Sequence, residues 1–178
     1  MTVGGGSSLA LVALDEVVLE ALVQAATTDA SADDVTPPLT PGAAWTPARI
    51  TWLRSFHRDR LAGLRGPAGE ATWAVVVDER VVGSVRLKRT DEHCVLEAGI
   101  WLTCSARRQG IGQRAIAELL QEAVALGALG VRADTTAANA GALRILQRLG
   151  FNLAAADSDN RVRALIVLAP QVFTAQHR

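Results

Sequence analysis

The residues whose types and spacing best suit a chemical role lie between positions 102 and 114, where an apolar stretch runs into a basic segment that contains glycines. Gly110 and Gly112 lack a β-carbon, so a ligand can approach their backbone closely. An amphipathic helix is predicted from this point, and its first turn offers unpaired N–H groups at the positive end of the helix dipole. The flanking positive charges are Arg107, Arg108 and Arg114. The segment is therefore predicted to bind an anion, with pyrophosphate as the best match.

Two other phosphate-binding signatures fit this segment less well. A dinucleotide fingerprint needs G-x-G-x-x-G, or alanine at its last position, and an acidic residue after the next strand. Ala115 is acceptable, but Asp134 falls within the next predicted strand and does not end it. The Gly-Lys-Ser/Thr ending of a nucleoside-triphosphate loop is absent. On this segment alone, an ordinary strand-to-helix turn with flanking arginines is the alternative interpretation.

A second segment, from Asn139 to Phe151, follows a predicted strand, begins with an asparagine that can cap a helix, and ends in Gly-Phe. The Arg107-x-x-Gly110-x-Gly112 loop together with this helix resembles the GNAT superfamily of N-acetyltransferases. The resemblance covers residues 72–151 well, and it includes both aminoglycoside-modifying and ribosomal-protein N-terminal branches. It implies an α/β fold (an α+β mixed sheet): a central, mostly antiparallel sheet with a splayed parallel pair and helices on both faces.

The resemblance also implies how acetyl-coenzyme A would be bound. Backbone amides of residues 108–113 would hold the pyrophosphate, and the free edge of the preceding strand would hydrogen-bond the pantetheine arm and the acetyl carbonyl. An open strand edge offers the N–H and C=O groups that such a peptide-like arm needs. Asn139 would contact the cofactor as well as cap its helix, and capping alone is the alternative. The expected cofactor-binding residues are Ile100, Trp101, Leu102, Arg107, Arg108, Gln109, Gly110, Ile111, Gly112, Gln113 and Asn139.

Direct acyl transfer to an amine needs a base for the incoming ammonium and a proton source for the leaving thiolate. Glu97, on the apolar strand that leads into the loop, is the candidate catalytic base. We expect its pKa to be raised by apolar surroundings, or the carboxylate to act through a water. A solvent-facing carboxylate or an ion pair with Arg86 is the alternative role. Glu92 and His93, in the preceding turn, are the second and third choices.

The usual proton donor of the resembled family is missing. Many members use a tyrosine in the later helix, but the alignment on Asn139 places Leu146 there, and the chain contains no tyrosine. Protonation of the thiolate is then left to solvent, Ser105 or Cys104. A ping-pong route through Cys104 is disfavoured, because the sequence places no histidine beside it. A non-catalytic coenzyme-binding domain is therefore a rival interpretation.

The acceptor amine is expected to be selected by the N-terminal helices, the loop between them and the C-terminal hairpin. Acidic residues beside a cleft favour a polycation. The expectation is a small-molecule amine, with an aminoglycoside the most specific case, which implies antibiotic resistance. Plain solvated loops are the alternative. The strand 97–102 is also similar to strands of ribosomal-protein N-terminal acetyltransferases, so a protein α-amine is the main rival. The acidic residues are Asp29, Asp33, Asp34, Glu70, Asp157 and Asp159.

The elements that must position these residues follow from hydrophobic periodicity, caps and turns. Strands are predicted at 8–14, 72–77, 81–88, 95–102, 131–135, 151–155 and 162–168. Helices are predicted after the caps Asp15 and Thr46, over 110–126, and from Asn139 to 149, with a loop over 27–44. A hairpin meander followed by βαβ units predicts a mixed sheet with helices on both faces.

Bulk properties are consistent with one enzyme domain. The 178 residues are 49% apolar, enough for a core, so we expect a disordered tail over 1–8 and a single acetyltransferase domain over 9–178. Lysines plus arginines equal aspartates plus glutamates at 18 each, which gives no reason to expect a nucleic-acid or membrane partner. The two cysteines lack metal-ligand spacing, so no metal site and a cytoplasmic location are expected. Dimers are common in the resembled family, so a homodimer is one expected assembly.

Overall fold

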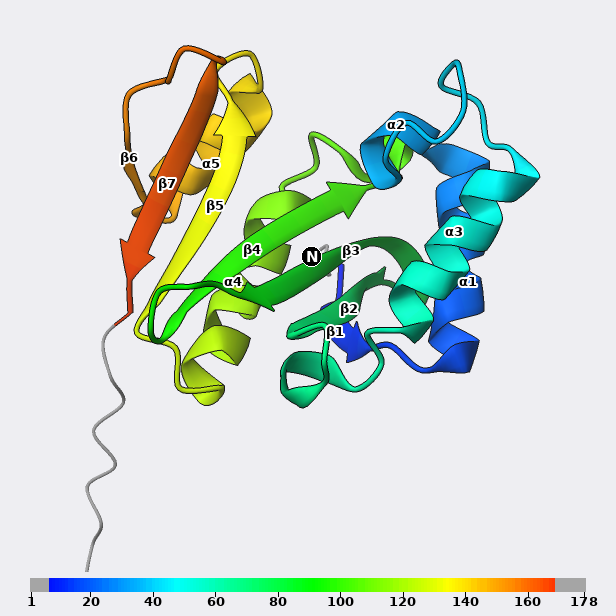
Figure 1. The fold of residues 1–178 in the computed structure, drawn as a ribbon, viewed down its shortest axis with the longest axis horizontal. Helices are drawn as coiled ribbons and strands as arrows, with labels where there is room; N and C mark the ends of the chain where they lie inside the picture. The colour runs from blue at the N-terminus through cyan, green and yellow to red at the C-terminus, as the bar shows by residue number, and fades with distance from the viewer. Residues whose placement is uncertain (1–6, 169–178) are drawn as a thin grey trace, which may run out of the picture.

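The computed structural model describes residues 7–168, which form one seven-stranded sheet flanked by helices (Figure 1). The strands lie in the order β1-β2-β3-β4-β5-β7-β6. Neighbours are antiparallel except β4 and β5, which are parallel. The predicted mixed, mostly antiparallel sheet is confirmed. The predicted tail lies mainly outside the described residues, and Ser8 at its end donates its backbone N–H to Asp78 Oδ1 over 3.0 Å.

The strands have bounds close to those that the sequence predicts. They are β1 Leu9–Ala13, β2 Glu70–Val77, β3 Arg80–Arg89, β4 Val95–Leu102, β5 Gly130–Thr136, β6 Asn152–Leu153 and β7 Arg161–Val167. The helices are α1 Glu16–Asp29, α2 Ala32–Val35, α3 Pro47–Arg58, α4 Ile111–Ala125 and α5 Ala140–Arg148, with single 3-10 turns at Gly63–Arg65 and Cys104–Ala106. The loop predicted over 27–44 is partly wrong, because α1 continues to Asp29 and the short α2 follows it.

Side chains fix the starts of α1 and α3 as predicted. Oδ1 of Asp15 accepts the Val18 N–H over 2.8 Å at the start of α1. The Thr46 hydroxyl accepts the Arg49 N–H over 3.3 Å at the start of α3, where proline occupies the first turn. Each such cap satisfies a backbone donor that the helix leaves unpaired.

The sheet buries a different set of helices on each face. On one face α4 covers the central strands, with Ala115, Ile116 and Leu119 packed against Val85 and Leu87. On the other face α1 and α3 form a smaller core, whose buried members are Leu19, Val23, Ala26 and Leu53 with Trp101 of β4 at its margin. Helices therefore lie on both faces, as predicted.

Strand β4 diverges from β5 along its second half (Figure 1). The parallel pairing runs only from Val95 opposite Gly130 to Ala98 opposite Ala133. On its other side β4 pairs with β3 to its last residue, Leu102 opposite Gly83. Residues 99–102 of β4 therefore have one edge without a strand partner.

Glycine at position 83 is required for the close approach of β3 to β4. Its φ is 156°, and a β-carbon there would lie 2.2 Å from the Trp101 carbonyl oxygen. Within residues 7–168 no helix has the length and apolar character that crossing a bilayer requires.

Candidate functional site

The predicted anion-binding loop joins β4 to α4 and ends in a left-handed glycine. Gly110 is the N-cap of α4 with φ 77°, a conformation that glycine adopts at little steric cost. Within residues 7–168 no side chain caps this end of the helix. The first backbone bond of α4 runs from the Arg114 N–H to the Gly110 carbonyl over 3.2 Å, so the first-turn N–H groups before it are free for a ligand.

A cavity of about 730 Å³ opens in front of these N–H groups, between α4 and α5. Six predicted cofactor-binding residues line it, namely Leu102, Arg107, Arg108, Gly110, Gly112 and Gln113. From the later helix the sequence predicted only Asn139, whereas the α5 residues that line the cavity are Ala140, Gly141, Arg144, Ile145 and Arg148. The spacing of Arg144 and Arg148, four residues apart and hence on one side of a helix, is the signal that could have found them.

This cavity, which we call the cofactor cavity, fits an anionic, extended ligand. Its walls carry four arginines and the free end of a helix dipole, which together favour phosphate groups. A β-carbon at position 110 would meet nothing within 4 Å, so the backbone there is open to a ligand. A β-carbon at position 112 would lie 3.0 Å from Cδ1 of Ile145, so a larger residue would crowd the space between α4 and α5. The residues present therefore fit the diphosphate of a coenzyme.

The other predicted cofactor residues have different surroundings. The Gln109 side chain donates to the Ser105 carbonyl over 2.6 Å, and Ile111 is buried in the core under α4. Asn139 caps α5 by accepting the Ala142 N–H over 3.1 Å. The cavity is not lined by Gln109, Ile111 or Asn139. Direct contact between the cofactor and these three side chains therefore stays a prediction.

Arg107 links the cofactor cavity to the N-terminal helices. Its Nε donates to the Leu102 carbonyl over 3.0 Å, and its Nη2 lies 2.7 Å from Oδ2 of Asp34 in α2. A second link joins Asp29 at the end of α1 to Ser105, whose N–H and hydroxyl both donate to the carboxylate. Those hydrogen bonds lower the pKa of Asp29.

A second cavity, of about 220 Å³, lies on the α1–α3 side of β4, and we call it the acceptor-side cavity. Gly99, Ile100 and Trp101 of β4 form one wall, so two predicted cofactor residues, Ile100 and Trp101, face it. The opposite walls come from α2, α3, β2 and β3, and they comprise Asp34, Val35, Trp52, Leu53, Phe56, His57, Thr72, Ser84 and Arg86. The open half of β4 therefore lies between two cavities of different chemistry.

Glu97, the predicted base, lies in a row of ion pairs across the central strands. Its carboxylate oxygens lie 3.2 Å from Arg86 Nη2 and 3.1 Å from Arg132 Nη2. Arg86 also lies 3.4 Å from Glu70 Oε2, and Arg132 lies 3.5 Å from Glu92 Oε1. The predicted partner Arg86 is thus present, and Glu97 itself does not line the acceptor-side cavity.

The expected rise in the pKa of Glu97 is wrong. Partial burial acts to raise this pKa, but the hydrogen bond from Arg132 and the charge of Arg86 outweigh it, so the pKa is lowered. The carboxylate is therefore ionised at neutral pH and is a weaker base than a free glutamate.

Neither of the two side chains considered as donors for the second proton transfer, Cys104 and Ser105, lines the cofactor cavity. Leu146, at the position of the usual tyrosine, is a core residue with 6% of its surface exposed. Cys104 is exposed, and the Ser105 hydroxyl is engaged with Asp29. His93, the third choice for the base that deprotonates the ammonium, lies in the turn before β4, with its Nδ1 2.9 Å from Cys94 Sγ.

The acidic residues predicted to attract a polycation are largely paired with the protein's own groups. Asp33 lies 2.8 Å from the buried Arg49, and Asp34 lies 2.7 Å from Arg107. Glu70, only 3% exposed, lies between Arg60 and Arg86 at 3.3 and 3.4 Å. Pairing of this kind cancels much of the field that a polycation would experience.

Comparisons with known proteins agree with this geometry. The profile of the acetyltransferase (GNAT) family matches residues 41–151. No protein with a curated functional description matches the chain in sequence.

Solved structures of several acetyltransferases have a similar fold. The ribosomal L7/L12 α-N-protein acetyltransferase RimL, in complex with coenzyme A, is 14% identical, with a TM-score of 0.73 over 92% of this chain and 96% of that one. Spermidine N-acetyltransferase from Vibrio cholerae is 15% identical, with a TM-score of 0.67 over 89% and 93%. The Campylobacter jejuni N-acetyltransferase PseH, in complex with acetyl-coenzyme A, is 16% identical, with a TM-score of 0.60 over 91% and 100%.

The matched region runs from the loop before α3 through β4, the glycine loop and α4 to the end of α5. It thus contains the open edge of β4 and both walls of the cofactor cavity. The chain therefore belongs to the acetyltransferase (GNAT) family, as the sequence resemblance implied.

Proposed function

We propose that the protein transfers an acetyl group from acetyl-coenzyme A to a primary amine of a small molecule, in one direct step. The observation that carries this proposal is the position of the open half of β4. It lies between a basic cavity suited to a coenzyme and an aromatic-walled cavity suited to an acceptor. A thioester held along this edge would present its carbonyl carbon to the acceptor-side cavity.

The cofactor cavity supplies binding and orientation. In this proposal the N–H groups of residues 111–113 and the four lining arginines hold the diphosphate. The unpaired backbone groups of residues 99–102 hold the pantetheine arm, as an added strand would be held. Acetyl-coenzyme A supplies an activated thioester, whose carbonyl carbon is the electrophile.

The edge of β4 also has the geometry to stabilise the reaction. Backbone N–H groups of residues 99–102 that lack a strand partner can donate to the oxygen that becomes negative during transfer. Such donors are fixed by the pairing of β4 with β3, so they need little reorganisation when the charge develops.

Glu97 is the proposed proton acceptor for the ammonium, acting through a water. It sits two residues before Gly99 on the same face of β4, and Arg86, which holds its carboxylate, lines the acceptor-side cavity. Because Glu97 is ionised at neutral pH, it can take a proton without prior activation. Leu146 occupies the place of the usual tyrosine, so we propose that the thiolate is protonated by solvent.

The acceptor is less tightly specified than the donor. We propose a compact amine, because the acceptor-side cavity, at about 220 Å³, is smaller than the roughly 300–1,000 Å³ typical of drug-sized ligands. An aminoglycoside, the most specific case that the sequence indicates, would have to extend beyond this cavity, where Asp33 and Asp34 are already paired. A protein α-amine is the second candidate, supported by the fold similarity to RimL.

A thiol-release assay with acetyl-coenzyme A and a panel of amines tests this function. We expect turnover with compact monoamines, weaker turnover with kanamycin, and little with peptide N-termini. Turnover on peptides alone would favour the second candidate. Tight binding of coenzyme A with no turnover on any amine would refute the enzymatic proposal and favour a binding domain.

A further inference from the structure

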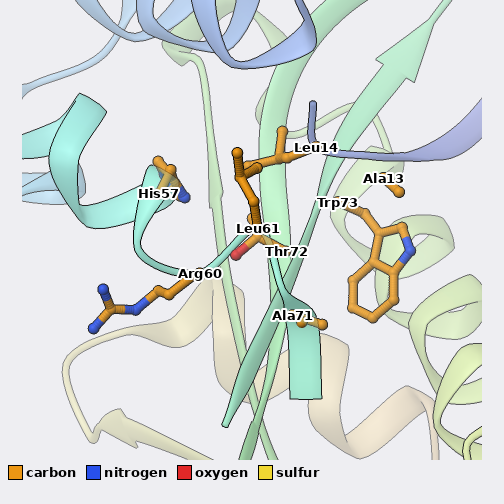
Figure 2. Close-up of a pocket in the computed structure, with 9 residues that line it drawn as sticks. Ala13, Leu14, His57, Arg60, Leu61, Ala71, Thr72 and Trp73 are labelled. Atoms are coloured by element: carbon orange, nitrogen blue, oxygen red, sulfur yellow. The ribbon is translucent and has the colours of Figure 1, made fainter. Parts of the chain in front are cut away.

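Two polar side chains face each other at the inner end of the acceptor-side cavity. His57 of α3 and Thr72 of β2 both line this cavity. Both also line a smaller cavity of about 100 Å³ directly behind it, beneath the end of α3. Figure 2 shows the His57 ring and the Thr72 hydroxyl directed into the same space between α3 and β2, while Trp73 points to the opposite side of the sheet.

Within residues 7–168, one polar atom of each side chain lacks a hydrogen-bond partner. Among the described residues, none hydrogen-bonds His57 Nδ1 or Thr72 Oγ1, although the two side chains are only 5% and 8% exposed. A buried polar atom without a partner destabilises a folded protein, because it has lost its hydrogen bonds to water and gained none in return. Two such atoms that converge on one cavity indicate a place where a ligand supplies the missing partners.

His57 is uncharged here at neutral pH. Burial, and then the charge of Arg60, lower the pKa of His57 to about 4. A neutral imidazole has one nitrogen that donates and one that accepts, and a threonine hydroxyl can do both. The pair therefore suits a neutral polar group and has no charge with which to hold an ion.

The charged residues nearby do not change this conclusion. Arg60 lines the smaller cavity and Arg86 the larger one, and Glu70 lies between their side chains. Asp34, at the other end of the larger cavity, is paired with Arg107. If the acceptor carried a second positive charge, that charge would lie near Arg60 and Arg86 at the inner end of the cavity. Glu70 already pairs with both arginines, so it would not balance the added charge.

The walls between the two ends are apolar and aromatic. The rings of Trp52 and Phe56 stack with centroids 4.7 Å apart, and Leu53, Val35 and Trp101 lie on the same cavity. Such walls accept a hydrocarbon or flat body by burial of apolar surface.

We infer that His57 and Thr72 form the inner recognition site for the acceptor, and that they hydrogen-bond a hydroxyl or amide group at the end of a compact, uncharged body. The reacting amine then lies at the opposite end of the cavity, beside Gly99 and Ile100 of β4. This inference rests on the proposed acetyltransferase function, and it defines the acceptor as a monoamine with a distal neutral polar group.

The test compares amino alcohols with alkylamines of the same chain length, from aminobutanol and butylamine to amino-octanol and octylamine. Each pair differs by a terminal hydroxyl, so the ratio of their kcat/KM values measures recognition of that group. In the wild type we expect the best amino alcohol to be favoured. In Thr72→Val, which keeps the shape of the side chain and removes its hydroxyl, we expect that ratio to fall about three- to tenfold.

Two further variants separate recognition from folding. Thr51→Val makes the same change on the exposed side of α3, outside both cavities, and should keep the wild-type ratio. His57→Gln keeps a polar end and should change the ratio less than His57→Leu. Kinetics for the alkylamines should be similar in the wild type and in Thr51→Val, because position 51 lies outside both cavities.

The outcomes distinguish this inference from the proposed function. Turnover of both amine series with an unchanged ratio in Thr72→Val would overturn the recognition site and leave the acetyltransferase proposal intact. If coenzyme A binds and no amine is acetylated, the enzymatic proposal fails. Calorimetric binding of the amino alcohols to the wild type and to Thr72→Val then decides the site, and equal or absent binding would overturn it. A preference for diamines over amino alcohols would also overturn it.

Discussion

His57 should make the stability of the protein depend on pH in a measurable way. Its side chain is 5% exposed, and its pKa in the folded state is about 4, against an ordinary value of 6.5. Between these values the unfolded chain binds a proton that the folded protein does not. The free energy of unfolding should therefore be highest above about pH 6.5 and should fall as the pH decreases toward 4.

The size of the effect follows from the two pKa values. A difference of about 2.5 pKa units corresponds to about 3 kcal/mol once both pH limits are reached, at 1.36 kcal/mol per unit. At about pH 5 most of the unfolded imidazole and little of the folded imidazole is protonated, so the expected loss relative to about pH 7.5 is about 2 kcal/mol.

Urea unfolding followed by tryptophan fluorescence can measure this loss. The wild type, His57→Gln and His93→Gln would be unfolded at about pH 7.5 and about pH 5. Contributions from carboxylates such as Glu97 are shared by all three proteins, so they cancel in the difference between variants. The wild type and His93→Gln, which alters an exposed histidine, should each lose about 2 kcal/mol more than His57→Gln.

Losses of free energy that agree within about 0.5 kcal/mol between the wild type and His57→Gln would show that folding does not lower the pKa of His57. Imidazole NMR gives an independent check, because the loss of one signal in His57→Gln assigns the His57 resonance of the wild type. The pKa from that resonance should lie well below 6.5, and an ordinary value would contradict the buried, neutral state of His57.

Three further predictions concern the proposed reaction. Glu97→Gln should lower kcat by about a hundredfold or more and leave the Kd for coenzyme A unchanged. The control variant Glu118→Gln, on the outer side of α4, should not lower kcat. A decrease in kcat of less than about threefold in Glu97→Gln would assign Glu97 a purely structural role. Arg144→Ala should weaken coenzyme A binding about fivefold, with a smaller dependence on salt than the wild type. Arg80→Ala, at the start of β3 and outside the cavity, should leave this binding unchanged, and calorimetry can measure both. Gly112→Val should weaken the same binding by tenfold or more, because its side chain would meet Ile145, and unchanged affinity would place the ligand elsewhere.

The strands and helices were predictable where local signals were strong. β4 has the predicted bounds, Val95–Leu102, because a run of apolar and β-branched residues lies between two polar turns. The caps at Asp15, Thr46 and Asn139 each accept the backbone bond expected of them. The four-residue α2 gave no such signal, because one turn of helix carries no periodicity to detect.

The cofactor cavity was predictable in part, and the acceptor-side cavity was not. The former depends on one continuous segment and one later helix. The latter is assembled from α2, α3 and three strands, so no local pattern reveals that His57 and Thr72 converge. The direction of the pKa shift of Glu97 was missed for a similar reason, because one of its arginines, Arg132, is 35 residues away in sequence.

The close pairing of β3 with the end of β4 depends on Gly83, a glycine that lines neither cavity. A side chain at Gly83 would collide with the Trp101 carbonyl and displace the end of β4 away from β3, toward the gap beside β5. In the proposed function, the pantetheine arm of the coenzyme would have to pass into that gap. Among homologous chains with this architecture, we therefore expect glycine to persist at position 83 while its neighbours in β3 vary, and acceptor preference to evolve without altering it.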